Sequence, residues 1–578
     1  MEWKIEQPDP ELTSKLAREL DLPPLLASIL ISRGMSEPQE ARAFLQPSLR
    51  DLPDPFLLPD LDRAVERLLV ALGSNEGIAV YGDYDADGLT STALLTDFLQ
   101  KIGAPVRTYI PHRLKEGYGL HNHAVESLAA GGIKVLVTVD CGVSDHQPVK
   151  RAKELGLDVI ITDHHQLGDH PPKALAVVNP KRRDSRFPQS DLAGVGVAFF
   201  LVGGLWKSLR DRGMVPPARL PELTPYLGLT ALGTVADVVP LTGVNRILVS
   251  EGLKHLGERT WPGLVALKQI SDLHPEQPVT ARDVGFRMAP RLNAVGRLDA
   301  PQPGLELLLA RDMSRARELG VILEERNAER KQLQEHVVRQ ARRILDDDPA
   351  DKHKFIVLAR EEWHRGVLGI AASKLVDIYH RPTILLSLKD GMALGSGRSI
   401  EGFSLYKALD QCQTVLEHFG GHDLAAGLGL SEEKVPELAA ALEEIAFQEL
   451  GEEIRRPALR VAAVLGLEEL DQNLIFQLLR LAPFGMGNPE PTVAVCGLKV
   501  LSCAVVGRNH LKLRLKGKGR ILDTIGFGLG DLLPDLGPRV SVALRPLASV
   551  YQGRTTYGWQ VVDIKKEEGG QPDLGAAE

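Results

Sequence analysis

Four short apolar runs, separated by stretches of helical texture, constrain the fold of this chain more than any other feature. They occupy residues 77–81, 133–139, 157–162 and 175–178, and few of their positions are polar. Strands of a parallel sheet show this pattern because helices cover the sheet on both faces. A helical stretch over 88–102 follows the first run. The sequence therefore predicts an α/β domain with a buried parallel sheet.

Acidic side chains follow these runs where the strands should end, and one more Asp follows a short apolar run at 233–236. Ligands of an open parallel sheet bind outside the carboxyl ends of its strands. Carboxylates gathered there repel one another and are costly to bury, and divalent cations are the simplest compensation. The candidate residues are Asp83, Asp85, Asp87, Asp140, Asp163, His164, His165 and Asp237.

The number of these side chains predicts two metal ions. About six Asp and His ligands are more than one magnesium takes from a protein. They suit two metals about 3.5–4 Å apart that share a bridging carboxylate. Oxygen ligands with one or two imidazoles favour manganese or magnesium over a structural zinc.

Two simpler interpretations compete with the metal site. The spacing of Asp83, Asp85, Asp87 and Gly88 matches the start of a calcium-binding loop. That loop follows a helix and needs Glu at its twelfth position, whereas this motif follows a strand and has Leu94 there. A lone Asp after a strand is usually a helix cap, but four such places make coincidence an unsatisfactory explanation.

The rest of the chain divides into segments with different patterns of apolar, charged and glycine residues. The length of the whole chain, 578 residues, suits three to five domains. Charge is dense and proline absent in the long helical stretch near the middle, which is typical of a solvated connector. The predicted order is an N-terminal helical segment (1–55), an α/β domain with a helical extension (56–304), a connecting helix (305–348), a second α/β domain (349–453), a small β-barrel or sandwich (454–564) and a disordered tail (565–578).

A basic strand stands out in the predicted barrel. The chain has a net charge of −8, yet no acid occurs between Glu490 and Asp523, where seven Lys and Arg lie. Residues 511–516 alternate leucine with a cation, so the leucines should face a core and the cations should face outward. A solvated strand is the simpler interpretation; we favour a barrel that grips a nucleic-acid backbone. The candidates are Arg508, Lys512, Arg514 and Lys516.

Composition excludes several classes of protein. Hydrophobic residues make up 44% and charged residues 25%, as in globular domains with real cores. No run of 18 apolar residues predicts a membrane span, and the acidic start does not suit a signal peptide. The four cysteines form no CxxC pair, which argues against a zinc ribbon or a disulfide framework. We therefore expect a cytoplasmic protein without a membrane partner.

The acidic motifs, with the sequence DHH at 163–165, resemble the DHH phosphoesterase superfamily. Other segments resemble its RecJ family, and they occur in order along the chain. They are GTVADVVPL at 233–241, PRLNAVGR at 290–297, WHRGVLGI at 363–370 and GGH at 420–422. The resemblance implies a multidomain α/β fold: a DHH domain with a parallel sheet, a long linking helix, a DHH-associated α/β domain and a C-terminal OB-fold barrel.

The resemblance also implies an activity, a single-strand-specific 5′→3′ DNA exonuclease that uses two manganese or magnesium ions. Asp140 would bridge both metals and His165 would lie by the scissile phosphate, so these two are the catalytic candidates. Which of Asp83 and Asp85 is the more direct ligand stays open. By position, one metal would be held by Asp87, His164 and Asp237, and the other by Asp83 and Asp85.

Polar residues of the second α/β domain should complete the site from across a cleft. Ser396, Arg398 and His422 lie in glycine-rich segments, where backbone N–H groups can approach a phosphate. Arg291 and Arg297, near a turn at Asn293, are further DNA-binding candidates. Their alternative is a salt bridge to the acidic cluster.

The predicted function is degradation of single-stranded DNA to mononucleotides in DNA repair and recombination. Two alternatives remain: another DHH phosphodiesterase, acting on oligoribonucleotides or cyclic dinucleotides, and a non-catalytic DNA-binding scaffold. The predicted barrel speaks against the first and the complete ligand set against the second. Single-strand-binding protein is a partner expected from the family alone.

Overall fold

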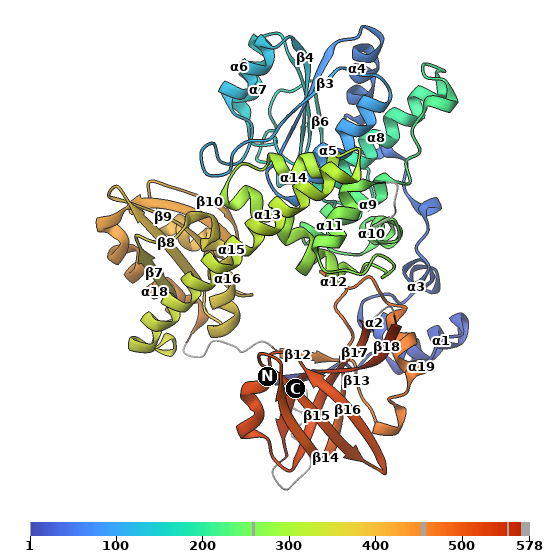
Figure 1. The fold of residues 1–578 in the computed structure, drawn as a ribbon, viewed down its shortest axis with the longest axis vertical. Helices are drawn as coiled ribbons and strands as arrows, with labels where there is room; N and C mark the ends of the chain where they lie inside the picture. The colour runs from blue at the N-terminus through green and yellow to red at the C-terminus, as the bar shows by residue number, and fades with distance from the viewer. Residues whose placement is uncertain (1, 257–260, 452–457, 552–553, 568–578) are drawn as a thin grey trace.

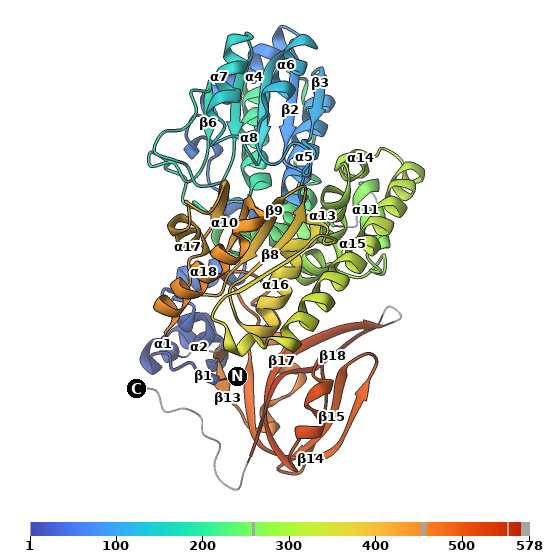
Figure 2. The same ribbon diagram turned by 90° about the vertical axis from the view of Figure 1, so that its left-hand side faces the viewer.

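The computed structural model describes residues 2–256, 261–451, 458–551 and 554–567. Figures 1 and 2 show an α/β block at one end, a β-barrel at the other and a second α/β block at the side. The multidomain α/β fold with a C-terminal barrel is therefore confirmed. Among the described helices, none combines the length and the apolar character that a membrane span requires.

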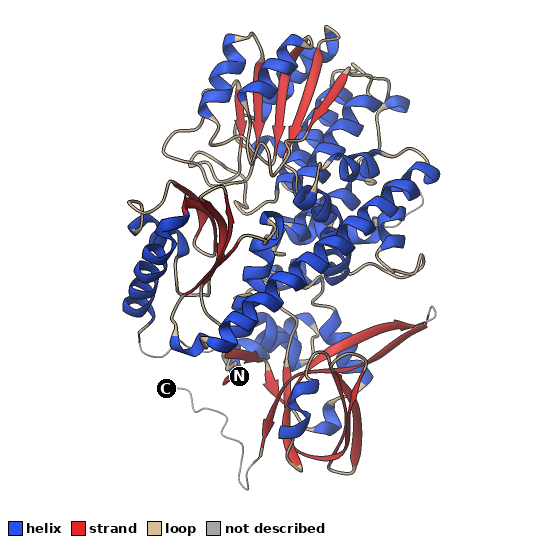
Figure 3. Cartoon of the chain, turned by 60° about the vertical axis from the view of Figure 1, so that its left-hand side comes forward, coloured by secondary structure: helices blue, strands red, loops and turns tan. Residues whose placement is uncertain are grey.

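The first sheet is parallel throughout and has the strand order β3-β2-β4-β5-β6. Figure 3 shows it with helices on both sides. Four of its strands match the predicted apolar runs. The edge strand β3 does not, because its residues are only half-buried or exposed and form no apolar run. The strands are β2 (Gly77–Gly82), β3 (Val106–Tyr109), β4 (Ile133–Val139), β5 (Asp158–Thr162) and β6 (Ala176–Val178).

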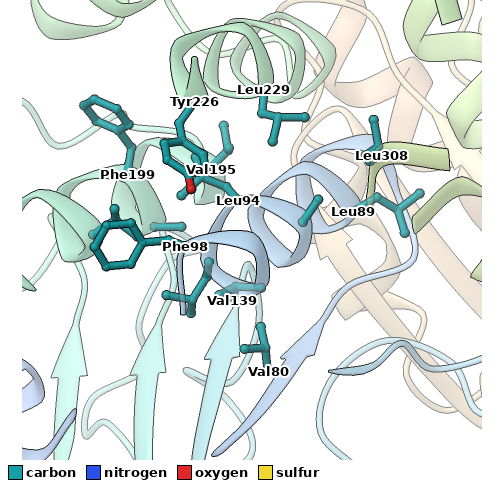
Figure 4. Packing of buried hydrophobic residues seen from close by; sticks show 14 of the residues in the cluster. Val80, Leu89, Leu94, Phe98, Val139, Val195, Phe199, Tyr226, Leu229 and Leu308 are labelled. Carbon is teal, nitrogen blue, oxygen red and sulfur yellow. The ribbon is translucent and has the colours of Figure 1, made fainter. Parts of the chain in front are cut away.

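Two cores cover the faces of this sheet. On one face, Val80 and Val139 pack against Leu94 and Phe98 of α5, as Figure 4 shows. On the other, Tyr81 belongs to a core with α6 and α7. Burial on both faces explains why the central strands are almost continuously apolar. The covering helices are α4 (Leu61–Gly73), α5 (Ala86–Lys101) and α8 (Gly194–Asp211) on the first face, and α6 (Asn122–Ala130) and α7 (His146–Glu154) on the second.

A helical extension follows the sheet, and it corrects two predictions. The apolar run at 233–236 is the last turn of a helix, not a strand, since it is too short for its periodicity to tell the two apart. Asn293 lies inside a helix rather than in a turn. The elements are α9 (Tyr226–Ala236), α10 (Gly243–His255), α11 (Pro262–Ile270), α12 (Ala281–Asp283), a π-turn (Val284–Met288), α13 (Ala289–Leu298) and α14 (Gln302–Leu309).

The long helix α15 (Met313–Asp347) links the two α/β blocks. Its first half packs against α11, α13 and α14, and its second half packs against α16. Its buried residues include Leu319, Leu323 and Val337. The helix therefore contributes to two cores and is not the solvated connector that its dense charge predicted, because most of its charged side chains lie on the exposed face and its apolar side chains on the buried one.

The second α/β block contains a five-stranded sheet of order β10-β11-β9-β8-β7. Helix α16 (Leu368–Tyr379) packs on one face, and α17 (Leu405–Gln411) and α18 (Val435–Leu450) pack on the other. The Gly-Gly-His segment at 420–422 lies in strand β10. The strands are β7 (Ile356–Arg360), β8 (Thr383–Lys389), β9 (Met392–Arg398), β10 (His418–His422) and β11 (Ala425–Ser431).

The C-terminal sheet closes into a barrel because β14 pairs with both β15 and β17. Along β15 the leucines are buried and the cations exposed, as the alternation predicted. Strand β18 continues through Lys566, past the predicted start of the tail at 565, and residues 568–578 of that tail lie outside the described residues. The strands are β13 (Ala463–Val464), β14 (Val493–Val506), β15 (His510–Gly517), β16 (Arg520–Gly526), β17 (Arg539–Tyr551) and β18 (Arg554–Lys566).

The N-terminal segment packs on the barrel. Strand β1 (Glu2–Ile5) pairs in parallel with β12 (Ala458–Val461). The helices α1 (Pro10–Leu20), α2 (Pro24–Ser32) and α3 (Pro38–Leu45) share one core with barrel strands and with α19 (Gln472–Leu479). The N-terminal segment and the barrel therefore share one hydrophobic core.

Candidate metal centre

The centre of the first sheet places three acidic residues side by side. Gly82 is in register with Val139, and Val139 with Thr162, so β2, β4 and β5 end level with one another. The next residues are Asp83, Asp140 and Asp163. Chain order reverses between β2 and β4, so Asp83 and Asp140 lie at the switch point where such sheets bind ligands.

The first turn of α5 supplies two more carboxylates. Asp85 is the N-cap, and its Oδ1 accepts hydrogen bonds from the backbone N–H groups of Asp87 and Gly88. The cap interpretation therefore holds for one oxygen of Asp85. The two oxygens of Asp87 accept from Gly194 N at 2.6 Å and Val195 N at 2.9 Å, where α8 begins. The positive end of the α8 dipole thus offsets part of the cost of burying Asp87 as a carboxylate.

Glycines let these acids approach the backbone. A Cβ atom at Gly194 would lie 2.6 Å from Asp140 Oδ1, and one at Gly233 would lie 2.8 Å from Asp87 Oδ1. Real Cβ contacts are not this short, so any larger residue at either position would push the carboxylate away. The glycine in the segment GTVAD at 233–237 is therefore required by the packing of α9 against the site.

The predicted ligands fall into two main groups whose ligand atoms lie within 4.8 Å of one another. One group is Asp87, His164 and Asp237, and the other is Asp83, Asp85 and Asp140. Asp140 also groups with His164 and His165, and its Oδ1 lies 3.1 Å from His164 Nε2, so it stands between the two sets. The structure brings all six predicted ligands together.

Unpaired buried atoms show that the site fits cations. Asp83 Oδ1, Asp140 Oδ1, Asp237 Oδ2 and both ring nitrogens of His164 are buried without a hydrogen-bond partner. Burial, followed by the charge of Asp85, raises the pKa of Asp87 to about 7. Buried polar atoms are normally satisfied, so this many orphans in one place require a ligand. Carboxylate oxygens with one imidazole suit manganese or magnesium.

Manganese binding should strengthen as the pH rises. Burial and neighbouring carboxylates raise the pKa of Asp87 to about 7 and that of Asp237 to about 9, so both hold protons in the metal-free protein at pH 6. Each proton that manganese displaces changes the apparent affinity by up to about tenfold per pH unit. Raised carboxylate pKa values also destabilise the metal-free fold as the pH climbs above about 4.

We therefore expect the rise in Tm on adding manganese to be larger at about pH 8 than at about pH 6. Thermal unfolding with manganese and with EDTA at both pH values measures it. An equal rise at the two pH values would mean that these carboxylates are already ionised without metal.

The adjacent histidines have opposite protonation. Burial and the charge of His165 lower the pKa of His164 to about 3, which leaves a neutral imidazole able to ligate a metal. Burial alone would lower the pKa of His165, but its Nδ1 hydrogen bond of 2.8 Å to Asp163 Oδ1 raises it to about 9. His165 is thus a cation at neutral pH, suited to a phosphate rather than to a metal.

Asp163 is a positioning residue and not a ligand. Its Oδ1 also accepts from the backbone N–H groups of His164 and His165, and its Oδ2 accepts from Val143 N. Tyr118 was missed by sequence reasoning. Its hydroxyl lies 3.1 Å from His165 Nδ1 and donates to the backbone oxygen of Asp140 at 3.2 Å. A tyrosine in an irregular loop carries no periodic signal that could have revealed it.

Three arginines converge beside the acidic cluster. Burial and the charges of Arg113 and Arg398 lower the pKa of Arg297 to about 9. Arg113 also lowers the pKa of Arg398, after burial. Arg113 stacks over the ring of Tyr84, next to the metal ligands, and sequence reasoning missed it. Arginines that repel one another in a half-buried place indicate an anion site.

The second α/β block completes this site, which we call the arginine pocket (Arg113, Arg297, Ser396 and Arg398). Arg398 Nη1 donates to Ser396 Oγ at 3.0 Å. A Cβ at Gly369, in the first turn of α16, would lie 2.7 Å from Arg398 Nη2 and 2.9 Å from Ser396 Oγ. The first turn of α16 therefore packs directly against these two side chains.

The remaining DNA-binding candidates are divided. His422 is exposed and lies in the same cross-strand row as Arg398, with Ala425 between them. Arg291 does not reach the arginine pocket: it is buried and pairs with Glu324 of α15 at 2.5 Å. A salt bridge was the alternative for this residue, but its partner lies outside the acidic cluster.

The barrel presents the predicted cations to solvent. Lys512 and Lys516 on β15 and Arg508 before it are exposed. Arg514 is exposed too, although Asp523 on the neighbouring strand lies 3.6 Å away. Arg508, Lys512 and Lys516 are therefore available to bind an anionic partner, whereas the charge of Arg514 is partly offset by Asp523.

Comparisons with known proteins agree with this architecture. Family models match as DHH family, N-terminal domain (77–234), DHHA1 domain (352–447) and RecJ OB domain (461–563). A Bacillus subtilis single-stranded-DNA-specific exonuclease RecJ is 40% identical over 550 residues, covering 94% of this chain and 68% of that protein. The Escherichia coli RecJ is 38% identical over 539 residues, covering 90% and 92%.

Solved structures give the same result. The crystal structure of RecJ from Thermus thermophilus in complex with Mn²⁺ superposes with a TM-score of 0.81 at 32% identity, covering 99% of this chain and 80% of that one. The complex with Mg²⁺ superposes with a TM-score of 0.76 at 31% identity, covering 98% and 79%. By domain content, sequence identity and fold together, the chain belongs to the RecJ family.

Proposed function

We propose that the protein hydrolyses single-stranded DNA from the 5′ end to mononucleotides, with two divalent metal ions, in cytoplasmic DNA repair and recombination. The observation that carries the proposal is the set of buried, unpaired ligand atoms at the switch point, facing an arginine pocket. Membership of a family whose named members are single-stranded-DNA-specific exonucleases supports it.

The ligand groups suggest how the centre is divided. Asp87, His164 and Asp237 would hold one ion and Asp83 and Asp85 the other, with Asp140 shared. Manganese or magnesium bound there would activate a water for in-line attack and neutralise charge on the phosphoryl oxygens. The protonated His165, held by Asp163, would place a positive N–H beside the scissile phosphate.

The arginine pocket would hold the 5′ phosphate and so set the polarity. α13 supports this arrangement, since Asn293 Oδ1 accepts from Ala86 N beside the metal ligands, and Arg297 Nη1 donates to Gly366 O of the second α/β block. The distance between pocket and metals is thereby fixed through one helix. His422 would add a donor at the edge of the pocket.

Arg398→Ala should weaken the binding of 5′-phosphorylated strands. Losing a bidentate arginine contact to a phosphate costs about tenfold or more in affinity. Bound manganese should not change, because Arg398 touches no ligand. Fluorescence anisotropy with 5′-phosphate and 5′-hydroxyl oligonucleotides measures the effect, and an unchanged preference for the phosphate would remove the pocket from the proposal.

The barrel cations would grip the strand farther from the cut. Replacing Lys512, Arg514 and Lys516 by Gln should flatten the slope of log K against log salt by up to about two units, given about 0.7 per phosphate contact. Titrations of a long strand at several salt concentrations measure the slope. A slope equal to that of the unmodified protein would mean that this strand face is only solvated.

One assay separates the proposal from its alternatives. End-labelled single-stranded DNA, duplex DNA, RNA and a cyclic dinucleotide are each incubated with manganese, magnesium or EDTA. The proposal predicts that the protein releases mononucleotides from single-stranded DNA when manganese or magnesium is present, and releases none in EDTA. Preference for RNA or the cyclic dinucleotide would favour another phosphodiesterase, and binding without cleavage would favour a scaffold. Single-stranded DNA and a single-strand-binding protein that coats it are the proposed partners.

A further inference from the structure

Three exposed apolar side chains lie on segments that pack around the end of α9, where Asp237 lies. They are Val238, Phe286 and Met486, with exposed fractions of 59%, 80% and 55%. Among large hydrophobic side chains in the described part of the chain, Phe286 and Val238 are the two most exposed. Neither the metal ligands nor the arginine pocket uses them. An apolar patch of this kind beside a catalytic site calls for an occupant.

A backbone contact joins the two segments that carry Val238 and Met486. Val238 directly follows the ligand Asp237 at the end of α9. Leu241, three residues on, donates its backbone N–H to Met486 O at 2.8 Å. Met486 belongs to the segment that leads into the barrel, so the chain entering the barrel is tied to the loop after the metal ligand.

A small buried core brings the third. Leu241 packs with Ala281, the first residue of α12, and with Val235 in the last turn of α9. The π-turn that contains Phe286 follows α12, and a Cβ at Gly285 would lie 3.9 Å from Val235 Cγ1. Phe286 therefore projects into solvent one residue from the contact with α9. We call Val238, Phe286 and Met486 the apolar strip.

The backbone under the strip is unusual at two points. Val238 has a φ of +61°, a left-handed conformation that a β-branched residue rarely adopts. The π-turn at 284–288 is a second departure from regular helix. Such departures concentrate at functional sites, because they persist only where the surrounding structure enforces them. Here they aim apolar side chains outward.

Positive charge flanks the strip toward the barrel. Arg282 lies four residues before Phe286 and so shares its helix face. No residue in the described ranges forms an ion pair or hydrogen bond with Arg282, which is exposed. Burial lowers the pKa of Arg545 on β17; the carboxylate of Glu490, 3.9 Å from Arg545 Nη1, opposes this shift and the charge of Arg282 adds to it. Arg282 therefore lies near this part of the barrel. Figure 1 shows α12 on the side of the α/β block that faces β17 and β18.

We propose that the apolar strip binds nucleobases of the single strand between the metal centre and the barrel. This inference rests on the proposed function. Proteins that hold single strands combine a cationic groove with aromatic faces on which bases stack. The basic strand β15 offers little of this, with Phe527 against His510 at its end. Phe286 supplies the aromatic face, and the Met486 thioether is a favourable neighbour for an aromatic ring.

Binding to two strands of equal charge tests the proposal. Oligothymidylate and an abasic strand of the same length carry the same phosphates, but only the first has bases. Affinities are measured in EDTA, so that the strand is bound and not cut. Phe286→Ala should weaken oligothymidylate binding about fivefold or more and leave the abasic strand unaffected. The matched control is Phe447→Ala, since Phe447 is 52% exposed on α18 of the second α/β block.

A second measurement does not depend on loss of affinity. The fluorescence of Phe286→Trp, corrected by subtracting the unmodified protein, should be quenched by oligothymidylate and not by the abasic strand. The fluorescence of Phe447→Trp should respond to neither. Equal quenching at both positions, or a Phe286→Ala variant that keeps its full preference for oligothymidylate, would overturn the strip. Cleavage by the unmodified protein with manganese is scored separately: quenching without cleavage would overturn the proposed function and leave the strip standing.

Discussion

Replacing Asp140 by alanine should remove manganese from both halves of the centre and lower the nuclease rate by at least about a hundredfold. Asp140 lies between the two ligand groups, and its Oδ1 is buried without a hydrogen-bond partner. Without it, two cations would face each other with their shared anion gone. Calorimetric titration with manganese and the rate of mononucleotide release measure the two effects.

The control is Asp158→Ala. Asp158 begins strand β5, at the end of the sheet away from the metal centre, and it pairs with Arg67. This variant should bind two manganese ions and cut at the normal rate. If Asp140→Ala also kept two metals and a near-normal rate, Asp140 would be a structural residue at a strand end and the two-metal assignment would fail.

Replacing His165 by alanine should lower turnover by at least about a hundredfold while manganese stays bound. His165 is cationic and hydrogen-bonded to Asp163, so the proposal places it at the phosphate and not on a metal. Asp163→Asn should move the alkaline limb of the pH–rate profile to lower pH, since the charge and hydrogen bond of Asp163 keep His165 protonated. Manganese stoichiometry and pH–rate profiles of both variants test this division of roles, and loss of metal from His165→Ala would contradict it.

The sequence predicted that these acidic side chains and His164 lie together, because most of them follow the strands directly. Strands β2, β4 and β5 are continuous apolar runs, and their acids come directly after them, so the edge where they meet followed from the parallel order. Asp237, a proposed ligand, lies with them as expected, although its segment is a helix end and not a strand. Its position after α9 depends on helix packing, which short apolar runs do not specify.

The arginine pocket was only partly predictable. Ser396 and Arg398 were among the predicted candidates, but Arg113 joins them from a loop near the first sheet. Neither spacing nor periodicity connects a loop arginine with a strand almost 300 residues later. Arg291 shows the opposite failure. It occurs in a segment typical of the family, yet its side chain pairs with Glu324 of α15 and does not reach the arginine pocket.

The core shared by the N-terminal helices and the C-terminal barrel has a consequence for biosynthesis. Leu26, Leu30 and other apolar residues of α1–α3 share a core with the barrel strands, whose first residues come about 400 positions later. At about 5–20 residues per second, a ribosome needs roughly 20–80 s to supply them. Until then the apolar face of the N-terminal helices stays exposed to water, and chaperones and proteases can bind this exposed face. Cutting off the barrel to obtain a smaller enzyme would make that exposure permanent, so a stable shortened form should lack both ends.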